Sequence, residues 1–266
     1  MSWWGKLVGG AFGFMLGGPL GALLGGVLGH NFDRGLGRLG EAERFQPGDQ
    51  ERVQTAFFTA TFSVMGHLAK ADGRVSPQEI ALTEAVIAQM DLDGERRRAA
   101  IRLFEQGKRG DFPLDQVLDQ FRRECHRRTS LIQMFLEIQI QAAYADGELD
   151  AAEEAMLLRI CRHLGVPEFL FRQLQRMIRA ERGFGGAPGG GAKAREPSLN
   201  DAYALLNLSP QADPDEVKRA YRRLRSQHHP DKLVSKGLPE EMTKLAEKKF
   251  HEIRQAYETI KKARGF

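Results

Sequence analysis

A run of 23 residues without a charged or strongly polar side chain, from Leu7 to Gly29, constrains the fold of this chain more than any other feature. As a helix it would be about 34 Å long at about 1.5 Å per residue, which matches the thickness of a bilayer. In water, its glycines would each destabilise a helix by about 1 kcal/mol relative to alanine, whereas lipid enforces backbone hydrogen bonding within the segment. We therefore predict a single transmembrane helix over residues 7–30, after a short N-terminus of residues 1–6.

Glycine recurs at every fourth position of this run, so one face of the predicted helix carries almost no side chain. A second helix can approach such a face closely, as in small-xxx-small dimers. We therefore expect a homodimer through the transmembrane helix. The expected seam consists of Gly9, Gly13, Gly17, Gly21, Gly25 and Gly29.

Two other interpretations of the run are a cleaved signal peptide and a flexible glycine-rich leader. The run is longer than the apolar core of a usual signal peptide, and no clear Ala-x-Ala site follows it. The flanking charges favour a cytoplasmic C-terminal part, since Lys6 precedes the run and Arg34, Arg38 and Arg44 follow it. A juxtamembrane linker over residues 31–49 would then lead into the rest of the chain.

Residues 50–182 have the apolar spacing of helices throughout, and a shift of 74 positions aligns this region with itself. The stretch 67–93 matches 141–167 without a gap, which indicates an internal duplication. In the second copy we expect Asp150 to cap a helix in a capping box with Glu153. The two-helix repeat with its Asp-Gly turn resembles the TerB-like helical domain, and the resemblance implies an all-α fold without a catalytic mechanism.

The acidic turns of the two copies raise the alternative of a cation site. Its candidate ligands are Asp72 and Asp146, with Glu79 and Glu153 nearby. A calcium loop of the EF-hand type needs oxygen ligands at alternating positions and a glutamate at the twelfth, and neither copy supplies that set. We therefore expect the turns to be structural and the protein to need no metal or other cofactor.

A glycine-rich segment over residues 183–199 separates this region from the last module. Its composition predicts a flexible linker, and about 17 such residues reach about 20 to 25 Å. Residues 200–266 hold 14 basic and 10 acidic side chains, whereas the remainder of the chain holds 25 of each. This excess is too small for a dedicated nucleic-acid-binding protein and fits a local patch for an acidic protein surface.

The module over residues 200–266 has the pattern of two antiparallel helices joined by an exposed loop. Residues 213–216 supply a cap, a proline at the first helical position and a capping-box glutamate, and Pro230 ends the helix. A polar loop follows to Gly237, and a second helix with an apolar face runs from about Pro239. The first helix carries a basic face formed by Lys218, Arg219, Arg222, Arg223 and Arg225.

Several segments of this module resemble the J-domain of the DnaJ family. They are Tyr203-Ala204-Leu205-Leu206, Ala220-Tyr221-Arg222, His229-Pro230-Asp231 and Phe250-His251-Glu252-Ile253. A lone His-Pro-Asp tripeptide is a weak signal, but its place between a basic helix and a helix with an apolar face is specific. The resemblance implies that this tripeptide and the basic face bind a DnaK-type chaperone and stimulate its ATPase.

The order of the three modules resembles the DjlA family of co-chaperones over essentially the whole chain. That resemblance implies an all-α regulatory co-chaperone that is tethered to a bacterial inner membrane, has a periplasmic N-terminus, and directs the chaperone to particular client or signalling proteins. The glycine/phenylalanine-rich segment and the zinc repeats of a general DnaJ do not occur in the sequence. Client holding is therefore not implied.

The sequence offers no catalytic constellation of its own, since it has no P-loop and no arguable Ser/His/Asp or Cys/His arrangement. Cys125 and Cys161 lie singly in helical apolar patterns, and we expect both to be reduced core residues. We therefore expect a protein that is not an enzyme. Two alternatives stay open: a membrane-bound adaptor or stress sensor that acts mainly through the TerB-like domain, and a metal-dependent protein that uses the acidic turns.

Overall fold

The computed structural model describes residues 17–28, 48–71, 87, 90, 92–144, 149–185 and 198–266, and every regular element within these ranges is helical. The predicted all-α class is thus confirmed. The elements are α3 (Gly18–Leu28), α4 (Asp49–Leu68), α6 (Gly94–Gly107), α7 (Leu114–Glu124), α8 (Thr129–Ala143), α9 (Ala151–Leu164), α10 (Glu168–Gly185), α11 (Leu199–Leu205), α12 (Pro214–Gln227), α13 (Pro230–Ser235), the short 3-10 helix η3 (Glu240–Met242) and α14 (Thr243–Arg264).

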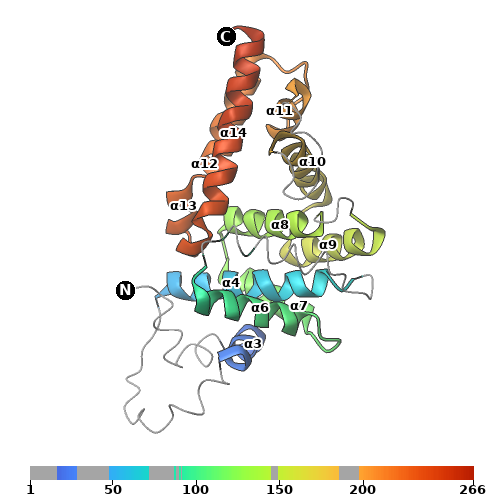
Figure 1. Cartoon of the computed structure of the whole chain (residues 1–266), viewed down its shortest axis with the longest axis vertical. Helices are drawn as coiled ribbons and strands as arrows, with labels where there is room; N and C mark the ends of the chain where they lie inside the picture. The colour runs from blue at the N-terminus through green and yellow to red at the C-terminus, as the bar shows by residue number, and fades with distance from the viewer. Residues whose placement is uncertain are drawn as a thin grey trace.

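Helix α4 forms the centre of the larger helical body, and α6, α7 and α8 pack around it (Figure 1). Its residues Phe57, Val64 and Leu68 are at most 2% exposed, as their helical spacing predicts. Helix α6 comes so close to α4 that a Cβ atom at Gly107 would lie 1.8 Å from the carbonyl oxygen of Ser63. Glycine therefore allows the two backbones to touch, and α4 and α6 are the most extensively packed pair of helices in the described part of the body.

Helix α9 shows the local structure that the sequence predicts for the second repeat. The Asp150 carboxylate accepts a hydrogen bond from the Glu153 amide at 2.7 Å, and the Asp150 amide donates to the Glu153 side chain at 3.1 Å. The helix ends at Gly165, whose φ of 70° is left-handed and suits glycine. The Asp-Gly turns themselves, with Asp72 and Asp146, lie outside the described residues.

Of the predicted membrane segment, the structure describes residues 17–28. Helix α3 begins there at Gly18, and its face with Leu20, Leu24 and Val27 is buried against the larger body. Among the described residues, no helix combines the length and the apolar character that crossing a membrane requires. The remaining expected seam positions Gly9, Gly13 and Gly29, like residues 1–6 and most of the linker 31–49, fall outside the described part.

Polar side chains of the body contact both ends of α3. The Gln120 side chain on α7 accepts a hydrogen bond from the Leu20 amide at 2.9 Å and donates to the Gly17 carbonyl at 3.0 Å. At the other end, Arg102 on α6 donates to the Val27 carbonyl at 2.8 Å. Because helix ends leave backbone groups without intrahelical partners, these contacts stabilise α3 in its place.

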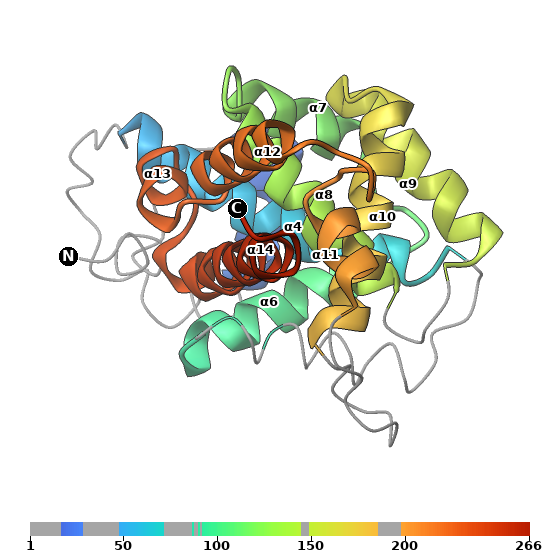
Figure 2. The same cartoon turned by 90° about the horizontal axis from the view of Figure 1, so that it is seen from above.

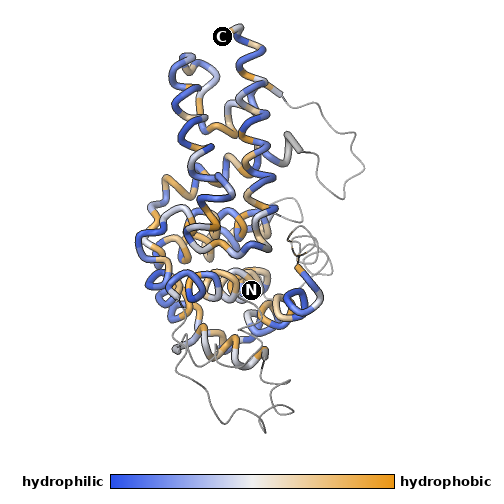
Figure 3. Tube along the Cα trace, turned by 90° about the vertical axis from the view of Figure 1, so that its left-hand side faces the viewer, coloured by the Kyte–Doolittle hydropathy of each residue, from blue (hydrophilic) through white to orange (hydrophobic). Residues whose placement is uncertain are grey.

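Helices α12 and α14 lie side by side and form an upright hairpin with α13 at its foot, and α11 packs between α14 and α10 (Figures 1 and 2). The predicted cap of α12 is present, since Asp213 and Glu216 form a reciprocal capping box and Pro214 occupies the first turn. Polar and apolar residues alternate along the helices of the hairpin (Figure 3), as expected when one face of each helix is buried. Helix α10 continues to Gly185, three residues into the predicted linker 183–199, and residues 186–197 lie outside the described ranges.

Candidate functional site

The His-Pro-Asp tripeptide lies at the foot of the hairpin, where α12 passes directly into α13. His229 has an extended backbone (φ −66°, ψ 122°) and precedes the first residue of α13, and Pro230 occupies that first position. Proline suits this place because its φ is already helical and its missing N–H has no intrahelical acceptor there. The sequence predicted a polar loop after Pro230, and the structure replaces most of that loop by a short helix.

The aromatic ring of Phe250 on α14 holds the His229 side chain. The two rings meet edge to face with centroids 5.5 Å apart, and the Arg225 guanidinium lies 5.8 Å from the Phe250 centroid. The Asp231 side chain is 91% exposed, and its Oδ2 atom lies 3.9 Å from Nδ1 of His229. The arrangement thus fixes the imidazole against α14 and leaves the Asp231 carboxylate accessible to a partner.

The predicted basic face lies on α12, the helix that leads into the tripeptide. All five basic residues of this face are exposed. Lys218 is held loosely, with its Nζ atom 3.8 Å from Asp215 and 5.5 Å from the centroid of the Phe266 ring. The fold therefore brings the tripeptide and the basic face together on one hairpin, as the sequence predicted.

Sequence reasoning missed a buried polar cluster beside the tripeptide. His228, one residue earlier, is 2% exposed, and its Nε2 atom lies 3.6 Å from Oε1 of Glu137 on α8. Lys249 on α14 is also buried; it forms an ion pair with Glu181 on α10 and lies 3.8 Å from Glu137. A signal was present, because Lys249 stands four residues from both Leu245 and Ile253 in the buried row of α14.

Burial dominates the electrostatics of this cluster. It lowers the pKa of Lys249, and the carboxylates of Glu137 and Glu252 act in the opposite direction. Burial also raises the pKa of Glu252, which the ammonium of Lys249 opposes. Charges removed from water are costly unless they are paired, so each of these groups depends on the others.

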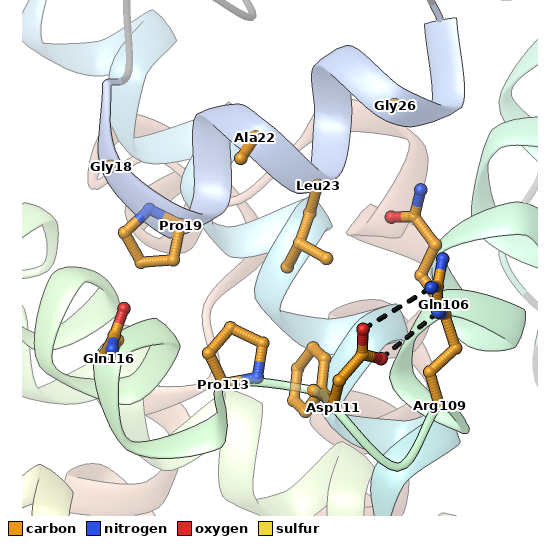
Figure 4. A pocket seen from close by; sticks show the side chains of 11 residues that line it. Gly18, Pro19, Ala22, Leu23, Gly26, Gln106, Arg109, Asp111, Pro113 and Gln116 are labelled. Carbon is orange, nitrogen blue, oxygen red and sulfur yellow. Dashed lines mark hydrogen bonds and ion pairs between the residues drawn. The ribbon is translucent and has the colours of Figure 1, made fainter.

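A pocket of about 620 Å³ lies between α3 and the connection from α6 to α7. Figure 4 shows Leu23 pointing from α3 into it and the ion pair of Arg109 with Asp111 (3.2 Å) at its edge. Its lining contains no Ser, Cys, His or Lys side chain. The pocket therefore offers no hydroxyl, thiol, imidazole or amine nucleophile among its lining residues.

The two cysteines also lack the properties of a nucleophile. Both Cys125 and Cys161 are buried in the core, as predicted, and burial raises the pKa of each thiol to about 12. A thiolate is the reactive form, so these side chains are suited to packing. Within the described ranges, no group of three or more His, Cys, Asp or Glu side chains is placed to hold a metal ion.

Comparison with protein families assigns all three parts of the chain. Residues 1–39 match the co-chaperone DjlA transmembrane domain, residues 58–176 the tellurite resistance protein TerB, and residues 201–264 the DnaJ domain. The chain is 45% identical over 271 residues to the co-chaperone protein DjlA of Coxiella burnetii, covering 100% of this chain and 99% of that one. It belongs to the DjlA co-chaperone family.

Other DjlA proteins show the same full-length similarity. The co-chaperone protein DjlA of Escherichia coli strain K12 is 44% identical over 274 residues, with 100% of both chains covered. That of Photobacterium profundum is 44% identical over 283 residues, with 99% of both chains covered. No solved structure matches the chain. In DjlA terms, the hairpin with the tripeptide is the J-domain, and the body around α4 is the TerB-like domain.

Proposed function

We propose that this DjlA-family protein stimulates the ATPase of a DnaK-type chaperone through His229, Pro230 and Asp231, with the basic face of α12 as the docking surface. The observation that carries the proposal is the exposed Asp231 carboxylate beside an exposed basic helix, on a module that matches the DnaJ domain. A complementary partner presents an acidic patch to the helix and a basic group to Asp231.

Each residue of the tripeptide has a role that follows from its contacts. Asp231 accepts charge-assisted hydrogen bonds from the partner, preferably from an arginine. Pro230 sets the direction in which the carboxylate leaves the hairpin, and His229, held by Phe250, fixes the turn from the other side. The basic face of α12 steers association and sets the register of docking.

His229→Gln and Asp231→Asn test this proposal. Both variants should abolish stimulation while the fold stays intact, because changes at accessible positions usually alter stability by less than about 0.5 kcal/mol. Loss of a charged contact that docking buries should cost about 2 to 5 kcal/mol, whereas Arg222→Ala should mainly weaken salt-sensitive association. The measurement is single-turnover ATP hydrolysis by the chaperone at saturating co-chaperone, with circular dichroism as the folding control.

Asp215→Asn is the matched control, since Asp215 is another exposed aspartate on the same helix hairpin and its side chain is 79% exposed. It should retain stimulation. A folded Asp231→Asn variant with full stimulation would show that the tripeptide is not the active element.

We propose in addition that residues 7–30 anchor the protein in a bacterial inner membrane, with the N-terminus periplasmic and the bulk cytoplasmic, near the client proteins it serves. The match of residues 1–39 to the DjlA transmembrane domain supports the anchor. Residues 17–28 enter a bilayer only when α3 leaves its contacts with Gln120 and Arg102. Anchoring therefore implies that the segment exchanges one apolar environment for another.

The glycine face of this anchor is proposed as the seam of a homodimer. Replacing Gly17 and Gly21 by leucine should block the close approach of two helices and lower dimerisation in a membrane-association assay. Ala22→Leu, on another face of the helix, provides the control and should leave dimerisation as it is. Equal dimerisation of the glycine variant and the parent chain would place the dimer interface elsewhere.

A further inference from the structure

The chain on both sides of the tripeptide is buried against the TerB-like domain. On one side, His228 lies beside Glu137. On the other side, Leu233 and Leu238 are at most 1% exposed and belong to the same apolar cluster as the residues of α4 and α8. Figures 1 and 2 show the foot of the hairpin, with α13, above α4 and to one side of α8. The tripeptide is thus held from two directions by another domain.

The start of α14 is attached by the buried ion pairs of Lys249. Its ammonium contacts the carboxylates of two TerB-like helices, Glu181 on α10 and Glu137 on α8. Glutamine side chains orient these carboxylates, since Gln133 donates to Glu137 at 3.1 Å and Gln141 donates to Glu181 at 3.1 Å. A buried ion pair that is fully supported in this way favours one docked orientation over others.

Direct contacts continue along the segment between these two anchors. Gln50 on α4 donates to the Val234 carbonyl at 3.3 Å, and Lys236 donates to the Ser130 hydroxyl at 2.9 Å. Gly237 has a φ of 105°, and a Cβ atom there would lie 2.6 Å from Cγ1 of Val53. Glycine at this position permits the close approach, so the segment that follows the tripeptide fits the TerB-like surface along its length.

The packing of the J-domain against the TerB-like domain leaves the groups that face the chaperone accessible. Asp231 is exposed although the J-domain is packed against the TerB-like domain, and so are Lys218 and Arg222 on the basic face. The TerB-like domain therefore supports the tripeptide from behind without covering it. A support of this kind differs from an inhibitory contact, which would bury the carboxylate or the basic helix.

We propose that Glu137 and Glu181 are positioning residues for the J-domain loop, so that the TerB-like domain and the J-domain act as one stimulating unit. The proposal rests on the proposed function. Glu137 acts through His228, which is joined by one peptide bond to His229, and through Lys249, which lies next to Phe250 in the chain. Because a displacement of about 1 Å in a positioned group can lower a rate a hundredfold, this support sets how well Asp231 engages its partner.

The test uses the full chain in detergent or nanodiscs and compares two matched pairs of variants. Glu137→Gln removes the carboxylate beside His228, and Glu154→Gln removes the carboxylate of an ion pair between α9 and α10 that involves no J-domain residue. Lys249→Met removes the buried ammonium, and Lys248→Met removes its exposed neighbour. Chaperone ATP hydrolysis is measured in single turnover against co-chaperone concentration.

Glu137→Gln and Lys249→Met should lower the maximal rate about two- to thirtyfold, the range expected when a positioning network is broken. The concentration for half-maximal stimulation should change by no more than about twofold, because the basic face that steers docking is untouched. Both controls should match the parent chain in both quantities. If Glu137 and Lys249 only stabilised the fold, their variants would change the maximal rate and the concentration for half-maximal stimulation together.

Hydrogen exchange shows whether the variants are locally changed or unfolded. The amides of Leu233 and Leu238, which donate to His229 at 3.0 Å and to Leu233 at 2.9 Å, should exchange faster in Glu137→Gln while those of α6 and α7 stay protected. If Glu137→Gln fails to fold, Gln133→Ala provides a milder loss of the same support and should lower the maximal rate in the same direction.

The remaining outcomes separate this inference from the proposed function. An unchanged maximal rate in folded Glu137→Gln would overturn the inference, and so would a higher rate, since the contact would then be inhibitory. Absence of stimulation by the parent chain would refute the proposed function itself. If stimulation depends on Asp231 and not on Glu137, the proposed function stands, but the TerB-like domain takes no part in stimulation.

Discussion

The two ends of the J-domain hairpin are stabilised by different cores. At the end away from the tripeptide, Leu206, Val217 and Ile260 pack in a small cluster made mainly of J-domain residues, with Ala180 of α10 at its edge. At the end with the tripeptide, Leu238 and its neighbours from α13 to α14 belong to the large cluster of the TerB-like domain. The structural support of the tripeptide end is thus supplied by the neighbouring domain.

This difference shows that the boundary of a sequence module need not be the boundary of a packed core. The J-domain is recognisable by sequence as a complete module, and its distal half has a core of its own. Its tripeptide half shares apolar contacts and buried ion pairs with helices that precede the linker. Mutations at the two ends of the hairpin should therefore destabilise different sets of helices.

The largest expected effect comes from a cavity at each end. Leu238→Ala and Ile260→Ala both truncate fully buried side chains and should each lower the free energy of unfolding by about 2 to 5 kcal/mol. Leu238→Ala should accelerate hydrogen exchange in α4 and α8 as well as in α13, whereas Ile260→Ala should accelerate it in α11, α12 and α14. If Leu238→Ala left the exchange of α4 and α8 unchanged, the two ends would not differ in the way described.

An effect of similar size is expected from the buried cation at the interface. Lys249→Met leaves the carboxylates of Glu137 and Glu181 buried without their cation and should lower the free energy of unfolding by about 3 to 5 kcal/mol. Lys248→Met, on the exposed side of the same turn, should change it by less than about 0.5 kcal/mol. Chemical denaturation followed by circular dichroism measures both.

Neutralising the whole cluster sharpens the same comparison. Combining Lys249→Met with Glu137→Gln and Glu181→Gln removes every buried charge of the triad, so much of the lost stability should return, because replacement of a buried ion cluster by neutral groups is often tolerated. A triple variant as unstable as the sum of its single changes would mean that the three groups act independently.

The sequence by itself determined the local structure and the position of the His-Pro-Asp tripeptide. Capping boxes begin α9 and α12 where they were expected, because side-chain to backbone hydrogen bonds within four residues depend on little else. The helical spacing of Phe57, Val64 and Leu68 marked buried positions, but α4 is buried on every side from Val53 to Gly66. The tripeptide, the basic face and their common hairpin followed from spacing together with resemblance to the J-domain.

Only the tertiary structure decided which core each buried face joins. The sequence predicted an apolar face on the last helix, but Met242 and Leu245 at its beginning belong to the cluster of the TerB-like domain rather than to the J-domain's own cluster. Nor does the sequence indicate the partners of the buried His228 and Lys249, which are Glu137 and Glu181. The physical reason is that periodicity records burial but not the surface that does the burying. The partner is chosen by contacts between residues about 70 to 180 positions apart, such as Lys249 with Glu181 and Gln50 with Val234.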